Sequence, residues 1–393
     1  MNKRVVLAYS GGLDTSVCVK WLADHGYDVI CFMGNVGQGD PSAAAITRAK
    51  VAGASKVIVR DLRKELITDF VWPALKAHAV YEGAYLLATA LSRPLLAKHM
   101  VEVAHQTGAR AVAHGCTGKG NDQVRFEVTA RILDPGLEII APVRVWEFRS
   151  RAQEIDYALA HKIPIDVTKK SPYSIDQNLW GTSIESGRLE NPWTEPPADT
   201  YRSIRSPERA AARAAYVTID FTRGVPAKLN GQGGDPVRLV ERLNALGAAH
   251  GIGRSDMIES RVVGIKSREV YEAPAGTMLL TAHQELERLV CDRELLSFKR
   301  SIGGKYAELI YAGLWYTPLK RALDGFINET QRRMTGTVRL KLYKGSCRVV
   351  GRKSPHSLYR ERLATYSAKD RFDQRSAEGF IKLFGLPYEG SGR

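Results

Sequence analysis

The first part of the chain alternates short apolar runs with longer stretches of helical periodicity. We expect strands in the short runs, at residues 5–9, 27–33, 56–60 and 111–113. We expect helices in the longer stretches, at residues 15–25, 42–52 and 92–108. This alternation indicates an α/β fold, with a doubly wound parallel sheet and helices on both faces. Ligands of such folds bind beyond the carboxyl ends of the strands, so functional residues should follow strands.

After residue 165 the pattern changes to the alternation of an antiparallel sheet. We expect strands there at residues 216–221, 277–282, 337–343 and 348–350, and helices at 235–247 and 283–298. These elements predict an α+β domain, which we place at residues 166–365, after a first domain at 1–165. Residues 373–384 predict an amphipathic helix in a tail at 366–393. Its apolar face either docks on a partner or folds back on its own domain.

The composition is that of a soluble globular protein. Of the 393 residues, 44% are hydrophobic and 25% are charged, and this length favours two domains. No apolar run is long enough to span a bilayer, and the run at residues 5–9 is too short for a signal peptide. The five cysteines form no C-x-x-C pair, which argues against a zinc site and a disulfide framework. We therefore expect a cytoplasmic protein that does not bind membranes.

The net charge of +15 is the one unusual bulk property. Such a charge fits either a nucleic-acid partner or acidic small-molecule substrates. The basic residues are spread along the chain, with no compact basic run that contains aromatic residues. We therefore interpret them as solvated surface and do not expect a nucleic-acid partner.

The clearest chemical motif joins the first strand to the first helix. It consists of nine consecutive residues: Ala8, Tyr9, Ser10, Gly11, Gly12, Leu13, Asp14, Thr15 and Ser16. The two glycines let the backbone turn tightly, and the hydroxyls add donors at the positive end of the helix. The motif therefore predicts an anion cup of the size of a pyrophosphate group. Asp14 would repel phosphate, so we expect it to hold a Mg²⁺ ion that bridges phosphate oxygens.

Other phosphate-binding motifs are absent from the sequence. It contains neither G-x-x-x-x-G-K-[ST] nor G-x-G-x-x-G. A second glycine-rich stretch at residues 34–39 follows the second strand and should lie beside the first loop. Gly34 is therefore a candidate for contact with adenine or ribose, although a flexible connection explains these glycines equally well.

A second cluster of polar residues follows the fourth strand, at residues 114–127. Gly115 and two further glycines admit a ligand close to the backbone, while Lys119 and Arg125 can neutralise carboxylates. Asn121 and Asp122 can accept hydrogen bonds from an ammonium group. The cluster therefore suits zwitterionic amino-acid substrates better than neutral ones.

Both motifs resemble those of known ATP-using enzymes. The loop at residues 10–16 is similar to that of the N-type ATP pyrophosphatase family, whose members cleave ATP between the α and β phosphates. Together with residues 114–127 it resembles the argininosuccinate synthetase family. Other strings extend the resemblance in the same order over nearly the whole chain, at residues 81–85, 92–94, 171–180, 263–268 and 271–274.

This resemblance implies condensation of citrulline with aspartate through citrullyl-AMP, with ATP cleaved to AMP and pyrophosphate, in arginine biosynthesis. It implies ATP contacts at residues 8–16, Gly34 and Gly115. It implies aspartate contacts at Thr117, Asn121 and Asp122. It implies citrulline contacts at Tyr85, Asn121, Arg125, Ser174, Ser183, Glu259 and Tyr271. A cytoplasmic homotetramer is also implied, with the C-terminal helix reaching across subunits.

The catalytic assignments remain partly open. Asp14 is the expected metal holder, and the general base is either Asp122 or a phosphate oxygen of AMP. His114 is equally well explained by a structural role at the end of a strand. One departure from the family is Ala90, which replaces a serine that contacts citrulline. A lost hydrogen bond to a charged group costs about 1.5–3 kcal/mol, so we predict weaker citrulline binding than in relatives with serine.

Two other functions remain open on the sequence alone. A thiolating enzyme of the same phosphate-loop family would act on tRNA, which the net charge and Cys116 favour. However, no partner cysteine has a suitable spacing, and a small buried residue is the more common role for such a cysteine. A binding module without activity would bind ATP and release no pyrophosphate.

Overall fold

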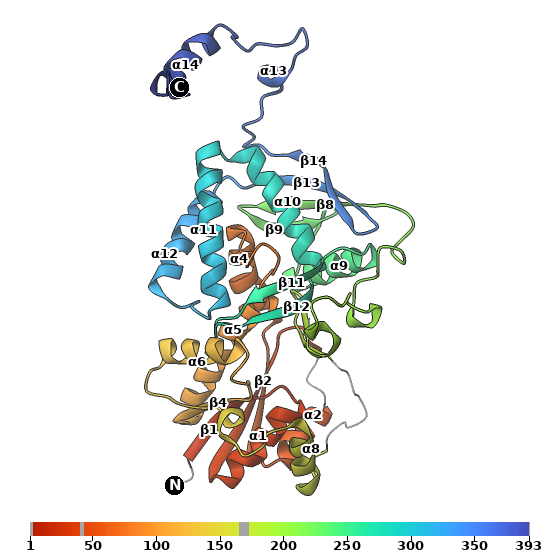
Figure 1. Cartoon of the computed structure of the whole chain (residues 1–393), viewed down its shortest axis with the longest axis vertical. Helices are drawn as coiled ribbons and strands as arrows, with labels where there is room; N and C mark the ends of the chain where they lie inside the picture. The colour runs from red at the N-terminus through yellow and green to blue at the C-terminus, as the bar shows by residue number, and fades with distance from the viewer. Residues whose placement is uncertain (1–2, 40–42, 165–172, 393) are drawn as a thin grey trace.

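The computed structural model describes residues 3–39, 43–164 and 173–392. A parallel sheet and its helices form one end of an elongated molecule, a larger α+β part follows, and a C-terminal segment projects beyond it (Figure 1). Some predicted positions lie outside the described residues. They are the start of the expected helix at residue 42, the expected domain boundary at 165, and residues 171–172 of the string at 171–180. Within the described part of the chain, no helix has the length and apolar character needed to cross a bilayer.

The first sheet is parallel, with strand order β3-β2-β1-β4-β5. Its strands are β1 Lys3–Ala8, β2 Tyr27–Asn35, β3 Lys56–Asp61, β4 Ala111–His114 and β5 Glu138–Ile140. The four strands that we expected are confirmed, and β5 was not predicted. The chain moves outward from β1 to β3 and then returns to β4, so the topological switch point lies between β1 and β4. Ligands of open α/β sheets bind at such a point.

Helices cover both faces of this sheet, as expected. They are α1 Leu13–Asp24, α2 Ala43–Val51, α5 Ala88–Thr107, α6 Asp122–Leu133, α7 Pro142–Val145 and α8 Arg151–Ala160. Successive strand residues enter different cores, because side chains alternate across a sheet. Val6 packs in the core that contains α5, whereas its neighbours Val5 and Leu7 pack in the core that contains α1 and α2. The alternation therefore fixes which sheet face each helix covers.

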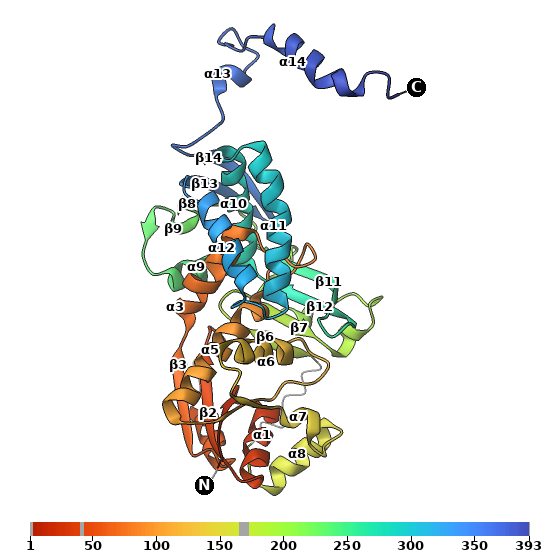
Figure 2. The same ribbon diagram turned by 90° about the vertical axis from the view of Figure 1, so that its left-hand side faces the viewer.

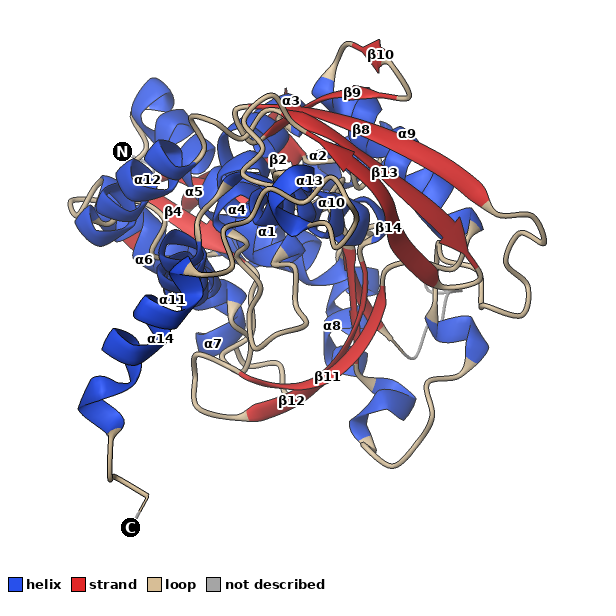
Figure 3. Cartoon of the chain, turned by 90° about the horizontal axis from the view of Figure 1, so that it is seen from above, coloured by secondary structure: helices blue, strands red, loops and turns tan. Residues whose placement is uncertain are grey.

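The second part of the chain contains two antiparallel sheets. The five-stranded sheet has the order β10-β9-β8-β13-β14 and contains β8 Ala215–Thr222, β9 Val225–Leu229, β10 Gln232–Gly233, β13 Gly336–Tyr343 and β14 Ser346–Lys353. The four-stranded sheet has the order β11-β12-β7-β6 and contains β6 Ser174–Gln177, β7 Thr182–Glu185, β11 Arg254–Ser260 and β12 Lys266–Glu272. Three expected strands are confirmed in the first of these sheets, which Figure 3 shows from above.

The strand that we expected at residues 277–282 is wrong. These residues lie inside α10, and the helices of this part are α9 Pro236–Ala249, α10 Pro274–Val290, α11 Arg293–Tyr311 and α12 Pro318–Thr330. Met278, Leu279, Ala282 and Leu286 are all buried, and their spacing of three and four residues is that of a helix face. Thr277 and Thr281 gave the segment the composition of a strand, and six residues are too few to separate a strand from a helix.

The single helix expected at residues 283–298 is also wrong. It spans the end of α10 and the start of α11, with Cys291 in an extended conformation between them. The Asp292 carboxylate then accepts a hydrogen bond of 2.9 Å from the backbone N–H of Leu295, which caps α11. The aspartate is thus the start signal of a new helix.

The short helix α4, which belongs to the first part of the chain, packs against helices of the second part. Residues 62–77 contain α3 Arg63–Glu65, a π-helical stretch Leu66–Val71 and α4 Trp72–Ala77. Trp72 and Leu75 share a core with α10, α11 and α12. A Cβ on Gly303 of α11 would lie 2.5 Å from the carbonyl oxygen of Ala77, so the two helices approach very closely. Figure 1 shows α4 beside α11, and Figure 2 shows α10, α11 and α12 side by side.

The C-terminal segment carries α13 Glu361–Ala364, α14 Ser376–Gly385 and a 3₁₀ turn at Leu386–Tyr388. The amphipathic helix that we expected is present. It does not fold back on its own domain but projects away from the body of the molecule (Figures 1 and 3). Its apolar side chains are exposed, at 65% for Phe380, 64% for Ile381 and 62% for Phe384.

Candidate active site

The phosphate loop turns tightly between β1 and α1. Gly11 has φ of +82°, and a Cβ there would lie 2.9 Å from the Cβ of Ala45, so both the backbone conformation and the packing require glycine. The N-terminus of α1 follows Gly12 and has no side-chain cap. Its backbone N–H groups are therefore available to an anion at the positive end of the helix.

Two of the loop hydroxyls hold the turn together. Ser16 Oγ donates to the carbonyl oxygen of Gly12 at 2.7 Å and lies 3.0 Å from the Tyr9 hydroxyl, and both side chains are buried. The Ser16 side chain is thus engaged within the turn, and its contact with ATP remains a prediction. Ser10 Oγ lies 3.1 Å from Thr15 Oγ1 on the accessible side of the loop. These two hydroxyls remain as the candidate phosphate donors.

A second carboxyl group lies beside Asp14. Glu154 of α8 is hydrogen-bonded to Asp14, and burial together with the Asp14 charge raises the pKa of Glu154 to about 7. Two carboxyl groups and two hydroxyls at one loop form the oxygen-rich donor set that Mg²⁺ prefers. The residues present therefore fit a magnesium ion, and a bound cation would favour the ionised form of Glu154.

The second motif joins the phosphate loop at the switch point. Ala8 of β1 pairs with His114 of β4, so the segments that follow both strands leave the sheet side by side. A Cβ on Gly115 would lie 3.0 Å from Thr15 Cγ2 and 3.5 Å from Cys18 Sγ. The absence of a side chain at Gly115 thus lets β4 approach the first turn of α1.

A cavity of about 280 Å³ opens next to this junction. Every substrate contact that the resemblance implies lines this cavity, and Gly115 does too: Tyr85, Gly115, Thr117, Asn121, Asp122, Arg125, Ser174, Ser183, Glu259 and Tyr271. The cavity brings together residues from the first part of the chain and from the four-stranded sheet of the second. The roles of the individual residues remain proposals.

Glu259 is the deepest acidic group of the cavity. It is 2% exposed, and its carboxylate accepts hydrogen bonds from the hydroxyls of Tyr311, at 2.5 Å, and Tyr271. Burial raises the pKa of Glu259, while the two tyrosines and Arg125 oppose this shift. Tyr271 in turn stacks on Tyr85 with ring centroids 4.1 Å apart. An aromatic wall thus holds a carboxylate where an ammonium group could pair with it.

Asp122 lies between two arginines on the other side of the cavity. Arg93 donates to Asp122 Oδ2 at 2.9 Å, and Arg125 donates to Asp122 Oδ1 at 2.8 Å. Although burial opposes it, these two guanidinium groups lower the pKa of Asp122. Arg93 also donates to Asp176 Oδ2 at 2.6 Å. Asp122 is therefore ionised at neutral pH and rigidly placed, which makes it a better anchor for an ammonium group than a proton acceptor.

Three ionisable side chains at the cavity lie in contact with one another: those of Arg261, Glu185 and Glu269. Arg261 donates to Glu185 and, at 2.9 Å, to Glu269 Oε1. Burial and the charges of Glu185 and Glu259 raise the pKa of Glu269 to about 9 despite Arg261. Glu269 is thus protonated at neutral pH, and Arg261 is left as the cationic partner of Glu185.

The position that departs from the family does not line the cavity. Ala90 is completely buried, and its backbone N–H donates to the Tyr85 hydroxyl at 3.2 Å. The neighbouring Thr89 does line the cavity, and its hydroxyl lies 2.9 Å from that of Ser183. The weaker citrulline binding expected from Ala90 remains a prediction.

His114 and Cys116 have distinguishable roles. His114 is 1% exposed, and its Nδ1 accepts the backbone N–H of Cys116 at 3.2 Å, so Nε2 donates to Glu127 Oε1 at 3.0 Å. These bonds support the structural role for His114. Cys116 lines the cavity and is partly exposed, so the buried position that we expected is wrong. Burial of its sulfur nevertheless raises the pKa of the Cys116 thiol, which makes it a poor nucleophile.

Gly34 lies inside β2, not in a flexible loop. A Cβ at this position would lie 2.4 Å from Leu96 Cδ2 and 2.9 Å from Leu62 Cδ1, so packing against α5 is sufficient to explain the glycine. In the following stretch, a Cβ on Gly37 would lie 2.7 Å from the backbone nitrogen of Leu179. These glycines thus allow close packing, and contact between Gly34 and a nucleotide remains a prediction.

Several site residues were missed by sequence reasoning. They are Thr89, Arg93, Glu154, Asp176, Glu185, Arg261, Glu269 and Tyr311. Arg93 and Asp176 belong to strings that carried the resemblance, and their charge within those strings was an available signal. Tyr311 ends α11, and nothing in its local sequence separates it from a core residue.

Comparisons with known proteins agree with this arrangement. The argininosuccinate synthase N-terminal HUP domain matches residues 4–164, and the argininosuccinate synthase C-terminal domain matches residues 173–390. The argininosuccinate synthase of Desulfitobacterium hafniense (strain DSM 10664 / DCB-2) is 54% identical over 386 residues, which cover 98% of this chain and 96% of that one. Those of Pelotomaculum thermopropionicum and Chlorobaculum tepidum are also 54% identical, with the same coverage.

One solved structure is weakly similar to part of the chain. A 4-thiouridine synthetase–RNA complex with bound ATP matches 40% of each chain at 17% identity with a TM-score of 0.30, too slight a likeness to carry an argument. The HUP-type sheet, the phosphate loop and the adjoining cavity define an ATP-using ligase. The chain belongs to the argininosuccinate synthase family, and the resemblance expected from the sequence is confirmed.

Proposed function

We propose that the protein condenses citrulline with aspartate to argininosuccinate, with ATP cleaved to AMP and pyrophosphate. The observation that carries this proposal is one cavity beside the phosphate loop, which gathers all the substrate contacts that the family resemblance assigns to residues of this chain. Both substrates are zwitterions, and the cavity has both cationic and anionic anchors. The proposal also agrees with the name argininosuccinate synthase that the relatives carry.

Citrulline binding is assigned to the aromatic side of the cavity. Its α-ammonium would pair with Glu259, which Tyr271 and Tyr311 hold in place. Its carboxylate would meet the hydroxyls of Ser174 and Ser183, near Arg125. Because Glu259 is buried, its ion pair with an ammonium group would be strong but would require exact placement. The ureido group would then point toward the phosphate loop.

Aspartate binding is assigned to the stretch after β4. Its ammonium or amine would lie near Asp122, and its carboxylates near Thr117 and the backbone N–H groups of the glycine-rich stretch. Asn121 is fixed from both ends, since its amide donates to Tyr311 at 2.8 Å and accepts from the N–H of Val262 at 2.8 Å. This asparagine would separate the two substrates and hold both.

The reaction would proceed in two displacements. The ureido oxygen attacks the α-phosphorus, a P–O bond forms, and the bond to the bridging oxygen breaks as pyrophosphate leaves. The aspartate ammonium group then gives one proton to a phosphate oxygen of the bound AMP, and the amine attacks the ureido carbon. A C–N bond forms, and AMP leaves with the oxygen as the C–O bond breaks. Magnesium, held by Asp14 with Glu154, would supply charge neutralisation on the phosphates. The side chains of the protein would orient the two amino acids, and the backbone N–H groups at the N-terminus of α1 would stabilise the charge on the leaving pyrophosphate.

We assign the C-terminal segment to assembly with other copies of the chain. The exposed apolar side chains of α14 support this assignment, because a helix face of this kind requires a covering surface. A homotetramer is the assembly that the family implies.

Pyrophosphate release tests the proposed function directly. It is measured with ATP and Mg²⁺ in the presence of citrulline, aspartate, both amino acids, or tRNA. We expect sustained release only with both amino acids, with AMP formed in equal amount. Release that requires tRNA would favour the thiolating alternative, and ATP binding without release would favour a binding module. Formation of ADP and orthophosphate would contradict the assignment of the loop.

A further inference from the structure

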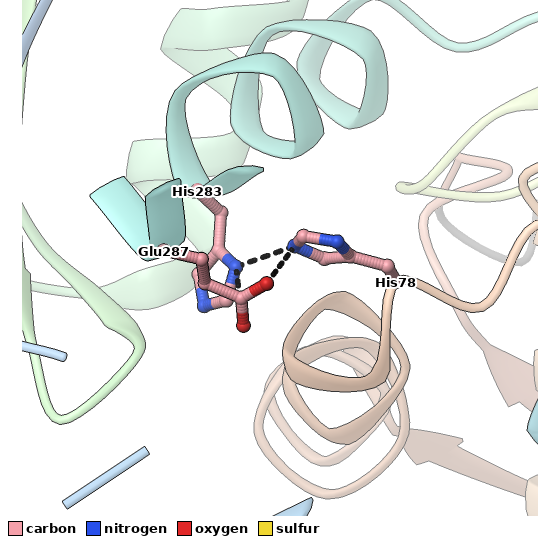
Figure 4. Close-up of side chains that lie close together, drawn as sticks. All are labelled: His78, His283 and Glu287. Carbon is pink, nitrogen blue, oxygen red and sulfur yellow. Dashed lines mark hydrogen bonds and ion pairs between the residues drawn. The ribbon is translucent and has the colours of Figure 1, made fainter. Parts of the chain in front are cut away.

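A compact cluster of metal-ligand side chains lies outside the cavity described above. It consists of His78, His283 and Glu287, whose candidate ligand atoms all lie within 4.8 Å of one another (Figure 4). His78 Nε2 lies 2.7 Å from His283 Nδ1 and 3.5 Å from Glu287 Oε2, and His283 Nδ1 lies 3.7 Å from Glu287 Oε1. Among residues 3–39, 43–164 and 173–392, it is the one group of three or more such side chains with this spacing.

Two distant segments supply the three side chains. His283 and Glu287 stand one turn apart on α10, so they share a helix face. His78 ends α4 in a left-handed conformation, with φ of +51°, which directs the chain away from the helix at this residue. Because α4 and α10 pack in one core, the cluster joins the two parts of the molecule.

The hydrogen bonds around the cluster leave the required lone pair on His283. Gln331 donates to Glu287 Oε1 at 3.0 Å, which places its carbonyl oxygen 2.9 Å from His283 Nε2. The Nε2 of His283 therefore carries the proton, and its Nδ1 faces His78 and Glu287 with a lone pair. An outer partner that fixes the tautomer of a histidine is the usual second shell of a metal ligand.

The spacing fits a tetrahedral ion. Ligand atoms at Zn–N and Zn–O distances of about 2.0–2.1 Å lie about 3.3 Å apart. The 3.5 Å between His78 Nε2 and Glu287 Oε2 is close to this value, and all three ligand atoms lie within 4.8 Å of one another. The distance between His78 Nε2 and His283 Nδ1 is shorter because the two nitrogens share a proton. A bound cation would take the place of that proton. We propose that His78, His283 and Glu287 form a binding site for a Zn²⁺-like divalent cation that links α4 to α10. This proposal departs from our expectation of no zinc site, which rested on the cysteine pattern alone.

The site has an entry path and one competing charge. His78, Glu287 and Lys299 line a separate cavity of about 470 Å³, from which a cation and a water ligand can reach the cluster. Lys299 Nζ donates to Glu287 Oε1 at 2.5 Å, so the ammonium group already neutralises one carboxylate oxygen. Glu287 Oε2 remains directed toward His78. Lys299 therefore limits the affinity, and its replacement by a neutral side chain should strengthen metal binding.

Cobalt is a suitable probe, because Co²⁺ replaces Zn²⁺ and absorbs visible light when nitrogen and oxygen ligands surround it. The experiment uses the full chain without a histidine tag, freed of metal with a chelator. We expect one Co²⁺ per chain, displacement by Zn²⁺, and a higher Tm with Zn²⁺. His283→Gln and Glu287→Gln should each weaken Zn²⁺ binding at least tenfold, and Gln331→Leu should weaken it by roughly 10–100-fold.

Two further variants make the test decisive. Lys299→Met should bind Zn²⁺ more tightly than the parent chain, a gain that misfolding cannot imitate. His356→Gln is the matched control, because His356 is exposed and remote from the cluster in the sequence, and it should not change the affinity. Absence of Co²⁺ absorption and of a Zn²⁺-dependent Tm shift in the parent and in Lys299→Met would overturn the proposal. Binding that His283→Gln and Glu287→Gln leave unchanged would overturn it as well.

Discussion

Arg93 and Asp122 form a partly buried ion pair that connects α5 to the start of α6, with Arg93 Nε 2.9 Å from Asp122 Oδ2. The guanidinium group spans two carboxylates, since it also reaches Asp176 of β6. A planar fork of this kind has a geometry that an ammonium group cannot reproduce. Arg93 is therefore a positioning residue for the proposed aspartate anchor.

Arg93→Lys should impair aspartate use more than stability. Loss of one charge-assisted hydrogen bond, about 1.5–3 kcal/mol, predicts a kcat/KM for aspartate lower by roughly 10–100-fold. Steady-state kinetics with saturating ATP and citrulline measures this change. Arg332→Lys is the matched control, because Arg332 is an exposed arginine that pairs with Glu329, and it should leave the kinetics unchanged. Equal losses in both variants would contradict the positioning role.

Gly11→Ala should abolish tight ATP binding. The left-handed backbone conformation costs a residue with a side chain roughly 1–2 kcal/mol, and the new Cβ would also collide with Ala45. Gly39→Ala is the control, because Gly39 has φ of +105° and open space around its Cβ position. In Gly39→Ala only the backbone conformation is unfavourable, because the new Cβ meets no other atom. We therefore expect this variant to retain ATP binding in isothermal titration calorimetry. Similar affinities of the two variants for ATP would show that the close packing of Gly11 against Ala45 is not needed for ATP binding.

Glu154→Gln should raise the Mg²⁺ concentration needed for half-maximal activity. The substitution removes one of two carboxyl groups at the phosphate loop, and we expect a shift of roughly tenfold, the lower end of the range for groups that support a metal site. The measurement is a Mg²⁺ titration of pyrophosphate release at fixed ATP. Glu147→Gln, on the chain segment just before α8, is a control that should behave like the parent. An unchanged Mg²⁺ requirement would remove Glu154 from the site.

Glu269 should make the free energy of unfolding fall as pH rises. Its pKa is raised to about 9 in the folded chain and is about 4.3 in an unfolded chain, so the folded state holds one more proton between these values. Each pH unit in this window then costs up to about 1.4 kcal/mol. Glu269→Gln removes the proton uptake and should flatten this slope. Urea unfolding at several values between pH 5 and pH 9 measures it, and identical slopes in both chains would refute the assignment.

Ala90→Ser should lower the KM for citrulline. If the serine hydroxyl restores a hydrogen bond of the family, about 1.5–3 kcal/mol predicts a change of roughly 10–100-fold. The buried position of Ala90 beside the Tyr85 hydroxyl makes a reorganised contact the alternative outcome. An unchanged KM would mean that Thr89 and Ser183 already supply the hydroxyl groups that citrulline needs.

The sequence was most informative where one local pattern determines the structure. The apolar runs located four of the five strands of the parallel sheet, and the loop from Ser10 to Ser16 and the stretch after β4 located the site. It failed at residues 277–282, where a six-residue window cannot separate a helix from a strand and only burial at helical spacing decides. It also missed Tyr311 and Glu154, because their functions arise from contacts across 52 and 140 residues of sequence, with Glu259 and Asp14.

The position of α4 has a consequence for biosynthesis. Trp72 and Leu75 are buried against α10, α11 and α12, and α10 begins about 200 residues later in the chain. At synthesis rates of about 5–20 residues per second, α4 leaves the ribosome roughly 10–40 seconds before its first partner. During that interval its apolar face must be shielded by something other than its native neighbours. Newly made chains should therefore depend on a holding chaperone, whereas the completed chain should not.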